Sequence, residues 1–415
     1  MKKRIVIIGA IIATLVLAFF LVKKPMASHY NKKGVQSFIT QDYADAEKNF
    51  EKALFWKGRS SEVLINMIKV GLAQDKIDGT SAYIEKLSKH HPDHPETYGL
   101  KGQVLVMQKH FEDAIPILTL AIENDTTLAY AYYYRGISRA NLNDLEGAAE
   151  DYLKAQQLDK GNIDALKERT IVLTKMEDFD ALIENYNAII ALDPSNTDAF
   201  LERGNFKLKI ADYENAITDY SQVIKLNDKL GEAYFNRGKS YAHLERFENA
   251  QLDFNSAAQL NYKKAGAYYN AGLASLRLGN SSKANTYLNN VLQLKGTEEY
   301  KANALYLLGV LEMMQGKNRK ATDYLTKAIN LDNEYADAYY NRGIANGLLE
   351  KHIEALSDLE TSLKLGKKTA DVYFAMGVQR IALNNFPAGC SDLKTAAEMG
   401  SDKAAEMRKQ YCNQY

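Results

Sequence analysis

Residues 133–155 read YYRGISRANLNDLEGAAEDYLKA, and two later stretches repeat this pattern: FNRGKSYAHLERFENAQLDF at 235–254 and YNRGIANGLLEKHIEALSDL at 340–359. Their glycines Gly136, Gly238 and Gly343 are 102 and 105 residues apart, which is three times 34 and three times 34 plus three. Extending this period gives eleven units, in phase over residues 27–298, with an insertion at 299–301 and a continuation over residues 302–403. The period leaves no room for another large domain.

Each unit of 34 residues carries small or aromatic side chains at fixed positions. The eighth position is Gly in nine units: Gly34, Gly102, Gly136, Gly204, Gly238, Gly272, Gly309, Gly343 and Gly377. The twentieth is Ala in eight, and the fourth is usually Tyr. Positions 4, 8 and 11 share one face of a first helix, and positions 20, 24 and 27 share one face of a second. The pattern predicts an all-α stack of helix pairs, because one pair cannot bury its own apolar face.

This pattern resembles the tetratricopeptide repeat over essentially all residues after 26. The resemblance implies a right-handed α-solenoid whose concave face, built from the first helices, holds a protein or peptide segment. Two units depart from the pattern, with Ile68 and Thr80 or Thr170 and Leu182 at the small positions, and we expect them to pack less regularly. Residues 404–415 are expected to form a capping helix over the last apolar face.

The N-terminus predicts a membrane anchor within residues 1–26. Residues 5–22 form an uncharged apolar run of 18 residues between basic brackets, about 27 Å long as a helix and thus close to the thickness of a bilayer core. We expect an uncleaved single-pass transmembrane helix, with a cleaved signal peptide as the alternative. The repeat body is placed on the exported, periplasmic side, with the cytoplasmic side as the alternative.

Charge and motifs exclude several function classes. Lys plus Arg and Asp plus Glu both number 52, so the net charge is +0 and nucleic acid is not expected as a partner. The chain has no glycine-rich phosphate loop, nucleophile elbow or CxxC motif, so neither an enzyme nor a cofactor is expected. His90, His91 and His94 are interpreted as a polar turn rather than a metal site.

Two positions change together from unit to unit. Arg at position 7 accompanies Asp, or once Asn, at position 23: Arg135 with Asp151, Arg169 with Asn185, Arg203 with Asp219, Arg237 with Asp253, and Arg342 with Asp358. We interpret them as structural pairs between the two helices of a unit, because a guanidinium fork matches a carboxylate. The alternative is a row of arginines that binds a partner's carboxylates.

Candidate partner-binding residues lie on the first helices. Position 5 is aromatic in six units: Tyr133, Phe235, Tyr269, Tyr306, Tyr340 and Phe374. These rings are candidate anchors for a partner, with packing between units as the alternative. Position 13 is basic in four successive units, Lys175, Lys209, His243 and Arg277, opposite the acidic Asp164, Asp198 and Glu232 at position 2. A partner with mixed charge and exposed apolar residues would suit such a groove.

The two cysteines lie near the C-terminus. Cys390 and Cys412 are each 11 residues from Ser401, where the last second helix turns into the cap, so antiparallel packing would place them at the same height. We expect a disulfide, which would need an oxidising, exported location, with two buried free thiols as the alternative. Together these features predict a membrane-tethered scaffold or adaptor that binds a protein segment in a multiprotein assembly. The alternative is a module that binds an envelope glycan or the cell wall through its tyrosines.

Overall fold

The structure is a computed structural model that describes the backbone of residues 2–412 and the side chains of residue 19 and residues 21–412. Within these residues every regular element is a helix. The chain forms two compact parts that each contain several 34-residue repeats: the first unit is Met1–Pro194 and the second unit is Ser195–Tyr415. The helices of the first unit are α1 (Lys2–Ile39), α2 (Tyr43–Trp56), α3 (Ser61–Ala73), α4 (Ile77–His90), α5 (Pro95–Met107), α6 (Phe111–Asn124), α7 (Ala129–Asn141), α8 (Leu145–Leu158), α9 (Ile163–Met176) and α10 (Phe179–Leu192).

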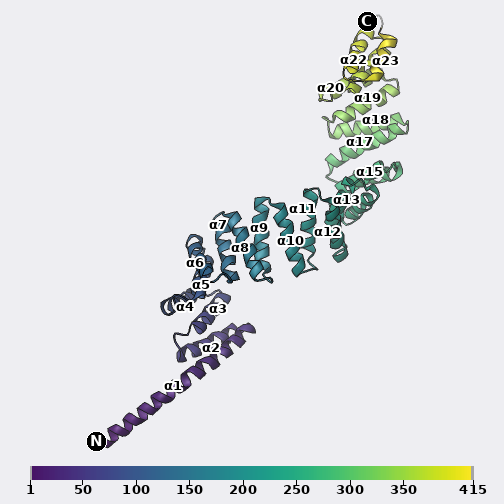
Figure 1. The fold of residues 1–415 in the computed structure, drawn as a ribbon. Coiled ribbons are helices and arrows are strands. Elements are labelled where there is room, and N and C mark those ends of the chain that lie inside the picture. The colour runs from purple at the N-terminus through teal and green to yellow at the C-terminus, as the bar shows by residue number, and fades with distance from the viewer. Residues whose placement is uncertain (1, 413–415) are drawn as a thin grey trace. The chain divides into compact units, whose positions relative to one another are not determined.

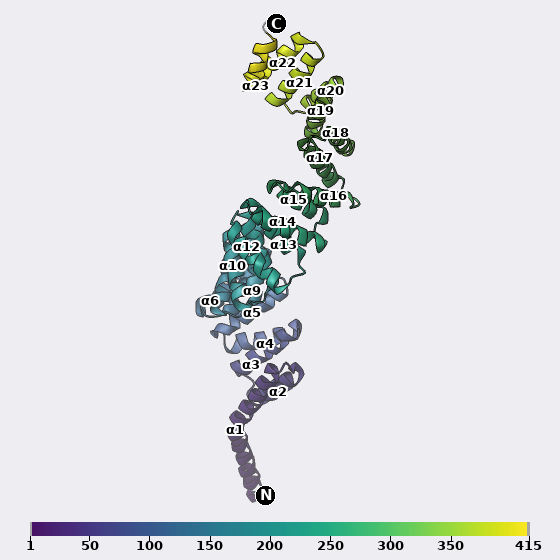
Figure 2. The ribbon, with the colours of Figure 1, turned by 90° about the vertical axis from the view of Figure 1, so that its right-hand side faces the viewer.

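The second unit continues the same alternation of first and second helices. Its helices are α11 (Thr197–Lys209), α12 (Tyr213–Leu226), α13 (Gly231–His243), α14 (Phe247–Gln259), α15 (Lys264–Arg277), α16 (Ser281–Leu292), α17 (Glu298–Met314), α18 (Asn318–Leu331), α19 (Ala336–Leu348), α20 (His352–Lys364), α21 (Ala370–Ala382), α22 (Phe386–Glu398) and α23 (Asp402–Tyr411). Within each of these two compact parts, consecutive helices lie side by side (Figures 1 and 2). Residues 299–301 belong to α17, which has 17 residues where α13 and α19 have 13.

Paired helices meet where a glycine faces a large side chain. A Cβ built on Gly102 would lie 2.4 Å from Cγ of Leu118, and one on Gly136 would lie 2.8 Å from Cε1 of Tyr152. No real Cβ approaches another atom so closely, so a side chain at this position would force the helices apart. The same contact, 16 residues apart in sequence, recurs as Gly34–Phe50, Gly204–Tyr220, Gly238–Phe254, Gly272–Leu288, Gly309–Leu325, Gly343–Leu359 and Gly377–Leu393.

The turn inside each helix pair also has a fixed backbone. The fifteenth residue of every unit has a positive φ, from 56° at Glu177 to 72° at Gly316. This left-handed conformation ends the first helix and redirects the chain. The second helix then begins, in several units, behind a capping side chain. For example, the Asp144 carboxylate accepts a hydrogen bond of 3.0 Å from the Gly147 N–H.

The expected transmembrane helix is corrected by the structure. Among the described residues, no helix combines the length and the apolar character needed to cross a membrane. This finding overturns the prediction of a single-pass anchor at residues 5–22 and of a membrane location, although the side chains of residues 5–18 and 20 lie outside the described set. Helix α1 does not end at residue 26 but runs on to Ile39, and within the predicted span the Phe19 ring packs 5.6 Å from that of Trp56 in α2. Helix α1 is therefore also the first helix of the first repeat.

The last helix covers the end of the second unit. Helix α23 packs on α22, and Ala404 and Cys412 join Leu393 and Ala396 in one buried cluster. The structure contains a disulfide between Cys390 and Cys412, whose Cα atoms are 5.7 Å apart. The covalent bond thus links the end of α23 to α22.

The glycine contact predicts opposite effects of one substitution at two sites. Gly102→Ala should lower the free energy of unfolding of the first unit by about 1–3 kcal/mol, because Leu118 is fully buried and cannot yield. Gly79→Ala in α4 is the control: its Cβ would meet nothing within 4 Å, so helix propensity should raise stability by up to about 1 kcal/mol. Urea unfolding of both variants measures the difference, and equal effects would contradict the contact.

The disulfide predicts that the cap depends on oxidation. Cys412→Ser should destabilise α23 by about 3 kcal/mol, because the bond closes a loop across a sequence separation of 22 residues. Native-state hydrogen exchange should then show faster exchange in α23 with little change in α13. Unchanged protection of α23 would count against a cap held by the disulfide.

Candidate functional site

The arginines at position 7 make the interior contacts of the helix pairs. Arg135 donates to Asp151 through Nε (2.9 Å) and Nη2 (2.7 Å), and the Asp151 side chain is only 4% exposed. The same two-bond pairing joins Arg203 to Asp219, Arg237 to Asp253 and Arg342 to Asp358. Each pair connects the first and second helices of one unit.

Each of three arginines also reaches the preceding unit, a contact that sequence reasoning missed. Nη1 donates to a hydroxyl oxygen at position 25 of that unit, over 3.0 to 3.1 Å: Arg135 to Thr119, Arg237 to Ser221 and Arg342 to Thr326. The guanidinium also lies over the ring at position 4, as Arg135 does over Tyr132 at 5.6 Å. These arginines are therefore occupied within the protein, and a partner's carboxylate would have to displace Asp. The co-occurrence of Ser or Thr at position 25 was the available signal.

One unit lacks the carboxylate partner. Arg169 is buried and donates only a longer bond of 3.3 Å to the Asn185 amide oxygen, and no described residue accepts from its Nε. Burial lowers the pKa of the Arg169 guanidinium because the charged form loses hydration. Thr170 and Leu182 replace the small residues in this unit. The Asn185 side-chain amide donates a hydrogen bond to Thr170 Oγ1.

The position 5 aromatics contact their neighbours, in most cases within the same unit. Phe235 packs on Tyr262, Tyr269 on Tyr300, and Tyr306 on Tyr335, with centroid distances of 5.0 to 6.0 Å. Lys367 lies over the Tyr340 ring, Tyr133 contacts Tyr134 and Tyr152, and Phe374 packs on the last buried cluster. Burial is the main cause that raises the pKa of Tyr133, to about 12. These contacts favour the packing interpretation for the position 5 rings.

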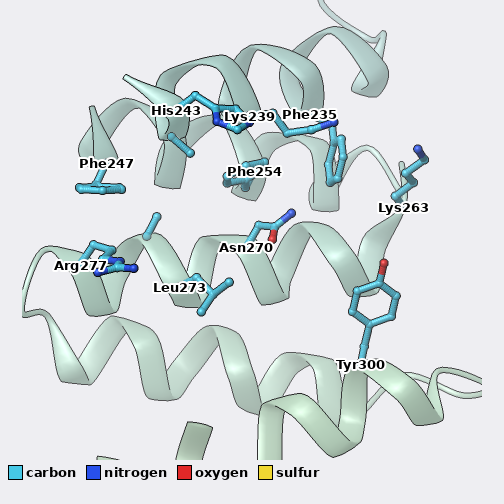
Figure 3. A pocket seen from close by; sticks show the side chains of 12 residues that line it. Phe235, Lys239, His243, Phe247, Phe254, Lys263, Asn270, Leu273, Arg277 and Tyr300 are labelled. Atoms are coloured by element: carbon cyan, nitrogen blue, oxygen red, sulfur yellow. The ribbon is translucent and has the colours of Figure 1, made fainter. Parts of the chain in front are cut away.

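Phe235 also lines a cavity of about 570 Å³ in the second unit (Figure 3). Helices α13 and α15 supply most of the lining, and α14 and the start of α17 complete it. The predicted residues His243 and Arg277 lie here with Phe235, whereas Lys175, Lys209 and the other five position 5 rings do not. The lining side chains that sequence reasoning missed are Lys239, Phe247, Phe254, Lys263, Asn270, Leu273 and Tyr300.

A second cavity, of about 430 Å³, lies in the first unit. It is lined by first helices alone, at Phe38 in α1, Lys69, Leu72 and Ala73 in α3, Leu100, Gln103 and Met107 in α5, and Tyr130 and Tyr134 in α7. Positions 6, 9, 12 and 13 of the repeat supply eight of the nine lining residues here and six of the twelve in the larger cavity. The lining is chiefly apolar here, and the single cation, Lys69, pairs with Glu96 at 3.1 Å.

The histidine turn does not assemble a metal site. His91 Nε2 lies 2.6 Å from the Arg59 carbonyl oxygen. Over the described residues, no group of three or more His, Cys, Asp and Glu side chains could hold a metal ion.

Comparison with known families decides the identity of the repeat. Models of the tetratricopeptide repeat match residues 201–267 and 265–298, a region that contains every residue lining the larger cavity except Tyr300. Residues 201–298 therefore match the tetratricopeptide repeat. A model of the coatomer epsilon subunit also matches residues 21–125, and no curated protein matches the chain. No catalytic family is indicated by these matches.

The solved structures to which this chain is similar share little sequence with it. A tetratricopeptide repeat protein from Parabacteroides merdae is 21% identical, with 60% of this chain and 98% of that chain covered and a TM-score of 0.42. PilF from Pseudomonas aeruginosa is 14% identical, with 52% and 98% covered and a TM-score of 0.45. The C-terminal part of a repeat protein from Cytophaga hutchinsonii is also 14% identical, with 58% and 98% covered and a TM-score of 0.45.

The arginine pairs predict a large cost for removing one carboxylate. Asp219→Ala should lower the free energy of local opening of α11 and α12 by about 3–5 kcal/mol, because it leaves Arg203 and Lys207 without the carboxylate that both contact. Hydrogen exchange of these helices measures the effect. Asp198→Ala, at an exposed site on the same α11, is the matched control and should change stability by less than about 0.5 kcal/mol. A loss no larger than that of the control would contradict the pairing.

Proposed function

We propose that this chain is a scaffold that binds an extended segment of another protein on the face formed by its first helices. Tetratricopeptide repeats are typical of protein–protein interaction, and the α13–α15–α17 cavity is the surface that carries the proposal for this chain. Its floor is apolar, with Phe254 and Leu273, and Asn270 offers an amide that has no hydrogen-bond partner among the described residues. An apolar floor with a few polar groups suits a peptide, which brings both side chains and backbone amides.

Two observations favour a protein segment over the other function classes. Stacking on a sugar needs an open ring face, but the Tyr269 and Tyr306 rings pack against Tyr300 and Tyr335. General acid–base catalysis usually places a histidine beside a carboxylate or another orienting group, but the residues that line the cavity include no Asp or Glu to pair with His243. The cavity is therefore better suited to binding than to either alternative.

Site-specific photocrosslinking tests the proposal. A photoreactive amino acid replaces Leu273 in the cavity or Leu252, which is 61% exposed on α14, in the full chain expressed in cells. We expect one protein to be captured from position 273 but not from position 252, and the purified protein to bind the wild-type chain. Leu273→Glu should weaken that binding by about tenfold or more, because it puts a charge into the apolar floor.

Capture of the same protein from both positions, or binding that Leu273→Glu leaves intact, would contradict the proposal. Binding of an envelope polysaccharide that competes at position 273 would favour the glycan alternative instead.

A further inference from the structure

We infer that the segment bound in the α13–α15–α17 cavity is acidic: an extended stretch with two carboxylates about four residues apart, on either side of an apolar side chain. This inference rests on the proposed function and names the chemistry of the partner.

The charge of the cavity supports an acidic ligand. Its lining contains four basic side chains, Lys239, His243, Lys263 and Arg277, and no acidic one. Lys239 and Arg277 form no ion pair with any described residue, in contrast to Arg237 on the same α13, which is held by Asp253. The two unpaired cations are therefore available to a carboxylate from outside.

Three of the four cations lie at the two ends of the cavity, and Lys239 lies between them on α13. In Figure 3, Lys263 lies at one end and His243 and Arg277 at the other, with Phe254 and Leu273 between them. Lys263 Nζ is 5.5 Å from the centroid of the Phe235 ring, which places it near the start of α13. His243 ends that helix and stacks on Tyr213, with parallel rings 4.6 Å apart. Both ends of the floor thus attract negative charge, and the floor between them is apolar, with Lys239 on the helix beside it.

The length of the floor sets the spacing of the ligand's charges. Phe235 and His243 are eight residues apart on one helix, which corresponds to about 12 Å. An extended chain rises about 3.3 Å per residue, so about four residues cover this distance. Residues i, i+2 and i+4 of an extended chain point to the same side, so carboxylates at i and i+4 enclose an apolar residue at i+2. A single carboxylate at a chain end would meet only one end of the floor.

Asn270 adds a contact for the ligand's backbone. It lies on α15 at the cavity, and its amide has no hydrogen-bond partner among the residues described. An amide side chain can both donate to and accept from a peptide group, which favours an extended peptide over a free acid.

The cavity of the first unit provides a contrast. Its one lysine, Lys69, is already paired with Glu96, so it lacks a free positive charge. The acidic segment should therefore bind only to the second unit.

Peptide binding to the full chain tests the inference. The probe is a peptide blocked at both ends, with the core Asp-Ser-Leu-Ser-Asp, and its affinity is measured by calorimetry. Arg277→Glu should weaken binding by about tenfold, and Arg277→Gln by a smaller factor, because a reversed charge repels where a neutral one only fails to attract. Lys154→Glu is the matched control, with the same change in net charge at an exposed site on the second helix α8, outside both cavities, and should change affinity by less than about twofold.

A second probe distinguishes recognition of the two carboxylates from nonspecific peptide binding. The same peptide with Asn for both Asp residues should bind about tenfold more weakly to the wild-type chain. Equal binding of the two peptides, or an equal loss in Lys154→Glu and Arg277→Glu, would overturn the inference. If crosslinking from position 273 still captures a protein, only the acidic chemistry falls. If crosslinking from position 273 also captures no protein, the proposed function is contradicted as well.

Discussion

Every regular helix pair depends on a contact that only a glycine permits. Where Gly136 meets Tyr152, a methyl group would collide with the ring, so the two helices pack as closely as their backbones allow. This contact fixes which face of each first helix is buried. It leaves positions 6, 9, 12 and 13 on another face, which supplies most of the lining of the smaller cavity and half of that of the larger one. The glycine at position 8 thus determines which face of the first helix stays accessible for the proposed binding of a partner.

The charged residues divide between the interior and the cavity. Arg237 is held by Asp253 and Ser221, so its guanidinium serves the stack and not a ligand. Lys239, two residues further on, faces the cavity without an ion-pair partner among the described residues. The first charge stabilises the fold through buried hydrogen bonds, and the second is open to a partner. Arg237 and Lys239 are both basic and lie on the same helix, but they have different roles because they lie on different faces of it.

The repeat made much of the fold predictable, because the residues that form each internal contact recur at the same spacing in many units. The spacing of Gly136 from Tyr152 and of Arg135 from Asp151 recurs from unit to unit, so periodicity alone indicates which helices face each other. The cavity was only partly predictable. Lysine at the position of Lys239 occurs also as Lys69, and asparagine at the position of Asn270 occurs in three other units, so neither residue marks this unit in the sequence. The membrane anchor was a wrong prediction. An apolar run reports its length and composition but not its contacts, and Phe19 packs against Trp56 within a helix that continues into the first repeat.

A structure of the full chain cross-linked to its partner would test the central claim most directly. We expect an extended segment of the partner to lie over α13 and α15, with an apolar side chain on Leu273 and a carboxylate near Arg277. A partner seated on the second helices α14 and α16, with the cavity empty, would show that the first-helix face is not the binding surface.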